Sequence, residues 1–226
     1  FLNNFKGQLV IDTGTVKLNE TGFDVIGTKA NMNAVYKSVT PTKALFEYNI
    51  KATDFDIQRA YKEIKIFHDM ATAAAYCKGI VSIDYHLKGR LGADMFPVYP
   101  SLQGGGTLSL QKIKVKGFKL FSAVSKATNR DSLNNPDLSK VDIKTTIANN
   151  IITIEKIKMR VFGFRPRFEG QVSFDGKLNL KGRIGLPPLG IFGIPFSVTG
   201  TQSNPVVKLK RGGDGKLEET SDTEEQ

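Results

Sequence analysis

The feature that most constrains the fold is an alternation of apolar and polar residues over residues 141–184. In its first part, one face carries the set Val141, Ile143, Thr145 and Ile147, and the residues between them are polar. Alternation with a period of two is typical of β-strands that bury one face. The stretch therefore predicts an antiparallel β meander with an apolar inner face.

A tight turn and a bulge set the register of the first hairpin in this stretch. Asn149-Asn150 predicts a two-residue turn, because Asn tolerates the positive φ angles that such turns require. This turn pairs Ile147 with Ile152 and keeps both side chains on the apolar face. After Ile154 the alternation shifts by one residue, which predicts a β-bulge near Glu155-Lys156.

The turn of the next hairpin follows from the same alternation. A two-residue Asp175-Gly176 loop would place Val172 beside a polar residue. A three-residue loop at 174–176 instead pairs Val172 with Leu178 on the apolar face, and it needs a left-handed residue at its end. Gly176 occupies that position, so we expect the three-residue loop with a positive φ angle at this glycine.

Alternation elsewhere raises the expected number of strands to about ten. The other strands are expected at 8–18, 22–36, 43–52, 79–91, 107–115 and after residue 196, with turn residues at 19–22 and a flexible glycine turn at 104–106. Residues 54–75 and 117–127 instead show the spacing of amphipathic helices, the first with Asp54 as its N-cap. The expected fold class is mainly β with two short helices (α+β), in which a curved antiparallel β meander forms a groove or open half-barrel.

The segment 185–196 is apolar but rich in Gly and Pro, which suits neither a helix nor a regular central strand. Ordinary loops are polar, so an apolar loop predicts contact with a membrane or a partner protein. We expect this loop to expose four side chains, those of Leu186, Leu189, Ile191 and Phe192. The alternative is that the loop folds back over an open end of the sheet and belongs to the core.

The charge of the chain is strongly positive and unevenly distributed. The net charge is +10, but residues 214–226 hold six acids and one Lys, so the remainder carries +15. We therefore divide the chain into a β-rich domain at 1–213 and a disordered acidic tail at 214–226.

The outer face of the meander is basic through Arg165, Arg167, Lys177, Lys181 and Arg183. A basic body favours acidic partners such as phospholipid head groups, although a solvated basic surface is the commoner explanation of charge alone.

Residues that could carry catalysis are scarce. His68, His86 and Cys77 lack the spacing of a zinc site, and the sequence contains no P-loop, nucleophile-elbow or metalloprotease motif. A single cysteine also excludes an internal disulfide. No apolar run approaches the length of a membrane-spanning helix. We therefore expect no enzyme, no metal site and no cofactor.

The apolar face of the meander predicts either a closed, packed core or an open trough. The expected lining of the trough comprises eight residues: Ile143, Ile147, Ile152, Ile154, Phe168, Val172, Leu178 and Leu180. Apolar surface left in water costs about 25 cal/mol per Å², so an uncovered sheet face would favour a lipid chain as its cover. The many strands offer more apolar face than two short helices can cover, although a barrel or sandwich would also bury it.

Five segments, at 54–67, 98–110, 135–159, 164–180 and 185–209, occur in an order that is typical of a known family. In these segments, and in the G-T-x-x-N-P pattern at 200–205, the chain resembles the C-terminal part of AsmA-like proteins, within the wider AsmA and TamB group of bacterial envelope proteins. Such proteins have an inner-membrane helix and a long periplasmic β groove with an apolar lining, which is thought to move phospholipid toward the outer membrane. The family has no catalytic residues to carry over.

The resemblance implies a non-enzymatic domain for phospholipid binding and transport between the inner and outer membranes and for outer-membrane biogenesis. It implies a periplasmic location within a longer protein anchored in the inner membrane, and the first residue, Phe1, suits a piece of a longer chain. The expected partners are phospholipid or another acyl lipid, a membrane surface and an outer-membrane protein. The alternative is a structural or protein-docking module at the end of a periplasmic bridge. Nucleic-acid binding would rest on charge alone, and we expect none.

Overall fold

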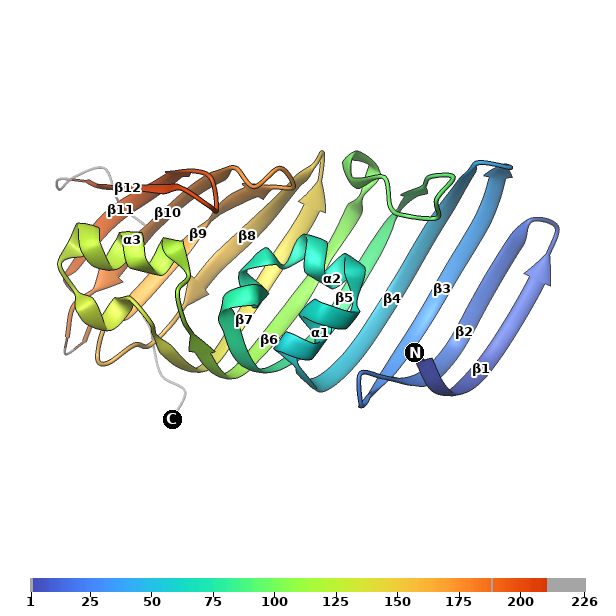
Figure 1. The fold of residues 1–226 in the computed structure, drawn as a ribbon, viewed down its shortest axis with the longest axis horizontal. Helices are drawn as coiled ribbons and strands as arrows, with labels where there is room; N and C mark the ends of the chain where they lie inside the picture. The colour runs from blue at the N-terminus through green and yellow to red at the C-terminus, as the bar shows by residue number, and fades with distance from the viewer. Residues whose placement is uncertain (1, 188, 211–226) are drawn as a thin grey trace.

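The computed structural model describes residues 2–187 and 189–210, and its twelve strands form one antiparallel sheet. The acidic tail predicted at 214–226 lies outside the described residues. Each strand pairs with the next strand in the sequence, so the sheet is a simple meander from β1 to β12 (Figure 1). Within the described residues β1 and β12 are the two edges, so the sheet is not closed into a barrel. The predicted fold class, mainly β with an open antiparallel meander, is therefore confirmed.

The elements follow one another in a simple order. The strands are β1 (Leu2–Asp12), β2 (Thr15–Val25), β3 (Thr28–Thr40), β4 (Lys43–Asp56), β5 (Cys77–Leu91), β6 (Gln103–Val115), β7 (Asp137–Ala148), β8 (Ile151–Lys158), β9 (Arg165–Ser173), β10 (Leu178–Gly185), β11 (Gly193–Gly200) and β12 (Pro205–Leu209). The helices are α1 (Ile57–Glu63), α2 (Lys65–Met70) and α3 (Lys119–Thr128), with short 3-10 helices η1 (Thr72–Tyr76), η2 (Tyr99–Ser101) and η3 (Asp131–Leu133).

The register predicted for the first hairpin of residues 141–184 is confirmed. Ile147 lies opposite Ile152, and the turn residues Asn149 and Asn150 have φ angles of 52° and 64°. The pairing of β8 with β9 shifts between residues 154 and 157, which is where the bulge is predicted. Local alternation and turn chemistry are therefore sufficient to define this hairpin.

The second hairpin is confirmed as well. Val172 lies opposite Leu178, and Gly176 closes the three-residue loop with a φ angle of 84°. The Gly176 amide donates a 2.8 Å hydrogen bond to the Ser173 carbonyl oxygen, which holds the loop closed. A side chain at this φ angle would be strained, so glycine is the residue that suits the position.

The first hairpin of the chain differs from the prediction. Residues 19–22 lie inside β2, and the chain turns instead at Thr13-Gly14, so the strand predicted at 8–18 is divided between β1 and β2. The pairing of β2 with β3 shifts by one residue here, which makes residues 19–22 a bulge. The Glu20 amide donates a 2.6 Å hydrogen bond to Asn33 Oδ1 at this bulge. The prediction is wrong because a bulge and a turn break the alternation in the same way.

The glycines at 104–106 are not a turn either, because they lie inside β6. Gly104 lies opposite Leu87 of β5 on one side and opposite Ile147 of β7 on the other. A Cβ atom on Gly104 would lie 2.2 Å from the His86 carbonyl oxygen. The glycines therefore allow neighbouring strands to approach closely, and the predicted flexible turn is wrong.

The helix predicted at 54–75 is divided into α1, α2 and η1, so the described residues form three short α-helices rather than two. Ile64 is extended, with φ −113° and ψ 102°, and it ends α1 immediately before α2 begins. The N-cap of α1 is Asp56 rather than Asp54, since the Asp56 carboxylate accepts a 2.8 Å hydrogen bond from the Arg59 amide. The second predicted helix is confirmed as α3.

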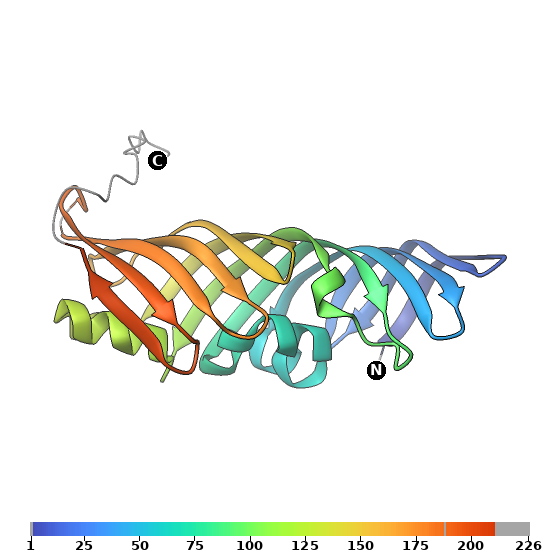
Figure 2. The same ribbon diagram turned by 90° about the horizontal axis from the view of Figure 1, so that it is seen from above.

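All three α-helices lie on one face of the sheet (Figures 1 and 2). Helices α1 and α2 lie over the middle strands, and α3 lies over the C-terminal strands, where β12 curls toward it (Figure 2). The Lys119 ammonium group donates a 2.8 Å hydrogen bond to the Ser203 carbonyl oxygen, which joins α3 to the β11–β12 turn. No helix lies over β1 to β3 in the described structure (Figure 1). The inner face of the sheet is therefore covered at its C-terminal end and open at its N-terminal end.

Candidate functional site

One row of paired residues crosses the sheet through ten consecutive strands. Strand pairing places these residues opposite one another from β1 to β10: Leu9, Leu18, Ala34, Tyr48, Leu87, Gly104, Ile147, Ile152, Val172 and Leu178. Residues that lie directly opposite each other project from the same face of a sheet. The row, which we call the apolar stripe, therefore runs along the face that carries the helices, and at Gly104 it has no side chain.

The eight residues predicted to line a trough share this face. Four of them, Ile147, Ile152, Val172 and Leu178, belong to the apolar stripe itself. The other four lie in the rows beside it: Ile143, Ile154, Phe168 and Leu180. The structure therefore places all eight predicted residues on one face of the sheet. Whether they can bind a ligand depends on what covers that face.

Helix α3 covers the C-terminal part of this face. Its residues Leu120, Phe121 and Val124 enclose, with Phe168 and Leu180 among others, a cavity of only about 20 Å³. A cavity needs about 10–15 Å³ of such volume to hold one water molecule, so no acyl chain fits there. This part of the predicted trough is packed core, and the open part of the face lies elsewhere.

The open part lies over β2, β3 and β4. A groove of about 310 Å³ is lined by Val16, Leu18, Ala34, Val35, Tyr36, Phe46, Glu47 and Tyr48 of these strands, and by Ile66, Leu91, Met95 and Pro97 from α2, the end of β5 and the loop after it. Ligand pockets usually measure about 300–1,000 Å³, so this groove is large enough to hold part of a ligand. We call it the N-terminal groove.

The apolar surface continues from the N-terminal groove onto β1. Leu9 and Ile11 of β1 lie opposite Leu18 and Val16 of β2, and the exposed fraction of Ile11 is 72%. Phe5 on the same strand is half exposed. Within the described residues, β1 is an edge strand with no helix over it (Figure 1). Apolar side chains therefore remain in water from β4 to the free edge of the sheet.

A polar network lies beside the N-terminal groove, at α2. The Tyr99 hydroxyl donates a hydrogen bond to the Asp69 carboxylate, and the Lys65 ammonium group donates another at 2.9 Å. Partial burial raises the pKa of Asp69, but hydrogen bonds from Tyr99, Lys65 and His68 outweigh this effect and lower the pKa to about 2. The Lys65 ammonium group also lies 5.2 Å from the centroid of the Phe96 ring. These contacts hold α2 against the segment that connects β5 to β6.

The N-terminal groove contains few ionisable groups. Burial, with a smaller contribution from the charge of Tyr85, raises the pKa of Tyr48 to about 12, so the Tyr48 hydroxyl stays neutral at physiological pH. Glu47 borders the groove, but its side chain projects from the opposite face of β4, where its Oε1 atom lies 2.9 Å from Nε2 of His86. An apolar ligand suits such a surface better than a charged substrate, because no set of charged groups converges on it.

The residues considered for chemistry in the sequence do not come together. Among the described residues, no group of three or more His, Cys, Asp or Glu side chains could hold a metal ion. His68 contacts Asp69, His86 contacts Glu47, and burial raises the pKa of the Cys77 thiol to about 11. In the part of the chain that the structure describes, no helix has the length and hydropathy needed to cross a membrane.

The apolar loop between β10 and β11 is exposed at three of its four predicted side chains. The exposed fractions of Leu189, Ile191 and Phe192 are 60%, 59% and 79%, whereas Leu186 is half-buried. Phe162, which the sequence did not single out, is also exposed, with an exposed fraction of 71%. Apolar residues alternate with polar ones on both sides of Phe162, so the pattern alone does not indicate a turn there. The following Gly163 is the local signal for the turn.

No protein-family model, curated protein or solved structure matches the chain. The fold and the groove define a class of protein, an open antiparallel β meander whose apolar inner face is covered by helices at one end. The resemblance to AsmA-like proteins stays a prediction. The function is therefore proposed from the geometry of the apolar face.

Proposed function

We propose that the chain is a non-enzymatic lipid-binding domain that holds the acyl chain of a phospholipid along the open, N-terminal part of the apolar stripe. The observation that carries this proposal is the N-terminal groove, whose lining is apolar, uncovered and continuous with the stripe. Removing apolar surface from water contributes about 25 cal/mol per Å², so a lipid chain lying in the groove would stabilise the complex. Such binding needs no directional polar contact, which agrees with the scarcity of ionisable groups there.

The proposed mechanism is passive. Strands β1 to β4 each place an apolar or aromatic side chain in the same row of the inner face. These side chains are Leu9, Leu18, Ala34 and Tyr48. An acyl chain can therefore move across the strands without passing a polar barrier, while its head group stays in water. In the envelope, this movement would serve phospholipid transport between the inner and outer membranes from a periplasmic protein anchored in the inner membrane.

A second function is favoured by the edge strand β1. Its outward-facing backbone groups have no partner strand among the described residues, and Val10 and Ile11 are exposed. Such an edge can accept a strand from another protein, and the added strand would supply the main-chain hydrogen bonds. This geometry supports a docking module at the end of a periplasmic bridge, with a protein such as an outer-membrane protein as its partner.

Photo-crosslinking in living cells tests the lipid proposal. A p-benzoylphenylalanine residue in place of Tyr36 would project into the N-terminal groove. Val35 borders the groove, but the same residue in its place would project from the opposite face of β3, because neighbouring residues of a strand alternate in direction. We expect phospholipid adducts at Tyr36 and none at Val35, measured by mass spectrometry of the purified protein. A third probe in place of Phe168, which α3 covers, should also capture no lipid.

Two results would contradict the lipid proposal. Equal lipid capture at Tyr36 and Val35 would show non-specific contact with membranes rather than binding in the groove. Protein adducts at Tyr36, without lipid in the organic extract of the natively purified protein, would favour the docking module instead.

A further inference from the structure

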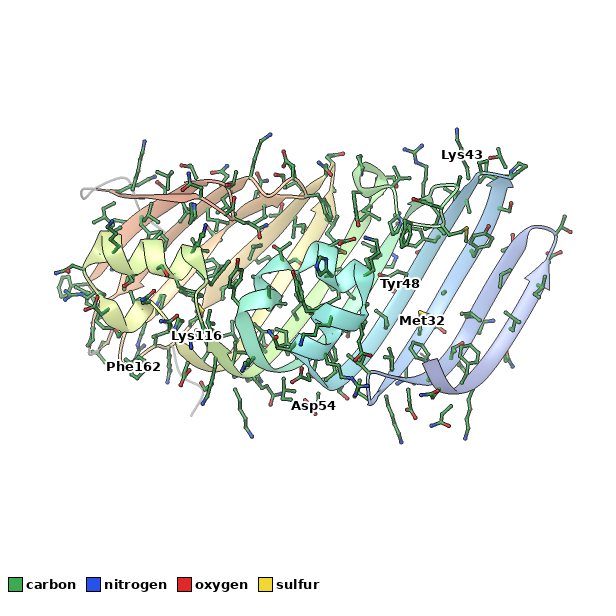
Figure 3. All side chains as sticks on the ribbon, in the orientation of Figure 1. Met32, Lys43, Tyr48, Asp54, Lys116 and Phe162 are labelled. Atoms are coloured by element: carbon green, nitrogen blue, oxygen red, sulfur yellow. The ribbon has the colours of Figure 1, made fainter. Side chains whose placement is uncertain are left out.

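Four exposed apolar side chains gather at the ends of the strands, in the half of the sheet that carries α3. They are Phe162 in the β8–β9 turn and Leu189, Ile191 and Phe192 in the β10–β11 loop, and we call them the apolar tip. Figure 3 places Phe162 in the half of the sheet that carries α3, whereas Tyr48, which lines the N-terminal groove, lies on β4 on the far side of α1 and α2. The apolar tip is therefore a surface distinct from the groove.

The two loops of the apolar tip are neighbours in space. Gly185, the last residue of β10, lies opposite Arg165 at the start of β9 and opposite Gly193 at the start of β11. A Cβ atom on Gly163 would lie 3.5 Å from Cγ of Pro187, so the β8–β9 turn and the β10–β11 loop are in contact. Their exposed side chains therefore form one surface rather than two.

Hydrogen bonds fix the β10–β11 loop in a conformation that exposes its apolar side chains. The Leu186 amide donates a 2.7 Å hydrogen bond to the Phe192 carbonyl oxygen, and the Gly190 amide donates a 2.8 Å hydrogen bond to the Leu186 carbonyl oxygen. The Arg183 guanidinium group donates to the Ile191 carbonyl oxygen. A loop ordered in this way presents its side chains at little further cost in conformational entropy when it binds.

The backbone at Phe162 is unusual for its residue type. Val161 and Phe164 exchange backbone hydrogen bonds of 3.0 and 2.8 Å, so Phe162 and Gly163 form a two-residue turn with φ angles of 45° and 84°. Asn, Asp and Gly are preferred in such turns, whereas a bulky side chain at positive φ is strained. The exposed fraction of Phe162 is 71%, so packing does not offset this strain. A residue type that is strained in its local conformation, and that does not stabilise the fold by packing, is expected at a functional surface.

Three basic residues, Arg160, Arg130 and Lys210, lie in or near the apolar tip. The sequences of the two loops, 159–164 and 186–192, contain Arg160 and no acidic residue. The Arg130 guanidinium carbon lies 5.7 Å from the centroid of the Phe164 ring, beside the same turn. The Lys210 amide donates a 3.0 Å hydrogen bond to the Pro195 carbonyl oxygen, which places this exposed lysine near the start of β11. An anionic surface would complement this combination of apolar and basic side chains.

We propose that the apolar tip docks this end of the domain onto an anionic phospholipid bilayer. The four apolar side chains would enter the interface between head groups and acyl chains, while Arg160, Arg130 and Lys210 would lie near the phosphates. A specific protein interface usually buries about 800 Å² on each partner, which is more than two short loops supply, so the geometry favours a bilayer over a protein. This proposal concerns a different surface from the N-terminal groove, and it does not depend on lipid binding there.

Vesicle flotation tests the proposal directly. We expect the wild-type chain to float with vesicles of phosphatidylcholine and phosphatidylglycerol, but not with vesicles of phosphatidylcholine alone, and added salt should weaken the binding. The double variant Phe162→Asn/Phe192→Asn should bind the anionic vesicles about tenfold or more weakly. The matched control is Val39→Asn, which changes an exposed apolar side chain on β3, outside the tip, and should bind like the wild type.

Two further measurements keep the outcome unambiguous. Because Asn suits a positive φ angle, Phe162→Asn should keep or raise the melting temperature while it weakens vesicle binding, which separates loss of docking from unfolding. The groove variant Leu18→Asp should lose lipid that copurifies with the protein but should still float with anionic vesicles. The proposal is overturned if the double variant floats like the wild type, or if the wild type binds neutral and anionic vesicles equally.

Discussion

The Tyr99 hydroxyl donates a hydrogen bond to the Asp69 carboxylate, and this contact joins η2 to helix α2. The Tyr99 ring also stacks on the Phe174 ring at the end of β9, with the ring centroids 5.3 Å apart. Tyr99 packs with Leu87 and Ile147 of the apolar stripe, between the covered and open parts of the inner face. Tyr99 thus links α2 to the middle of the sheet.

Replacing Tyr99 by Phe should weaken this connection in a pH-dependent way. The pKa of Asp69 is lowered from 3.8 to about 2 in the folded protein, so its ionised form stabilises the fold above about pH 4 and loses this effect as the pH falls through about 2. We expect Tyr99→Phe to lower the free energy of unfolding by about 1 kcal/mol at neutral pH, because a hydrogen bond to a charged group is lost. Denaturant titrations should show this difference shrinking as the pH falls toward about 2. A difference that is independent of pH would contradict the assignment.

Gly176 should resist substitution because of its backbone and not because of crowding. Its φ angle is 84°, and a Cβ atom there would meet nothing within 4 Å. We expect Gly176→Val to lower the free energy of unfolding by about 1–3 kcal/mol, since a β-branched residue at positive φ is strained. Thermal unfolding should show a much smaller loss for Gly176→Asn, which tolerates the left-handed conformation. Equal losses in the two variants would indicate that the conformation of the loop is not the cause.

Gly104 should be intolerant of even one added methyl group. A Cβ atom would lie 2.2 Å from the His86 carbonyl oxygen of the paired strand, so β5 and β6 would have to separate. We expect Gly104→Ala to cost about 1–3 kcal/mol in the free energy of unfolding, as overpacking usually does. The control is Gly22→Ala, where the nearest atom, Asn31 Oδ1, lies 3.5 Å away and the stability should hardly change. Similar losses in both variants would contradict this account.

The edge strand β1 should promote self-association of the isolated chain. Ile11 is 72% exposed on a strand whose outer edge has no partner among the described residues, and such edges pair with one another. We expect Ile11→Lys to reduce self-association at high protein concentration, because a charged side chain disfavours strand pairing at an edge. Sedimentation velocity measures this effect, with Val39→Lys on the internal strand β3 as the control. If both variants reduce association equally, general surface charge rather than the edge explains the result.

The hairpins of residues 141–184 show which parts of the fold the sequence can predict. The pairing of Ile147 with Ile152 and of Val172 with Leu178 depends on short turns and on alternation, and both are local properties. The division between β1 and β2 could not be predicted in the same way. A bulge near Glu20 and a turn would both interrupt the alternation of apolar and polar residues in the same way. Only the pairing of β2 with β3 distinguishes a bulge from a turn.

The apolar tip was only partly visible in the sequence. The loop with Leu189 and Phe192 is apolar and rich in Gly and Pro, so its exposure can be predicted from composition. Phe162 could not be found, because it interrupts a strand-like pattern with a turn that Asn or Gly would normally form. Only the structure shows that the two loops are in contact through Gly163 and Pro187.

By itself, the sequence determined which side chains share a face of the sheet, because the alternating directions of neighbouring residues in a strand fix this locally. Only the tertiary structure decided which part of that face is covered. Phe168 and Leu180 are covered by α3, whereas Leu18 and Tyr36 line an open groove, although all four fit the same pattern of apolar residues. The physical reason is that the cover comes from helices distant in sequence, whose positions depend on packing across the whole sheet.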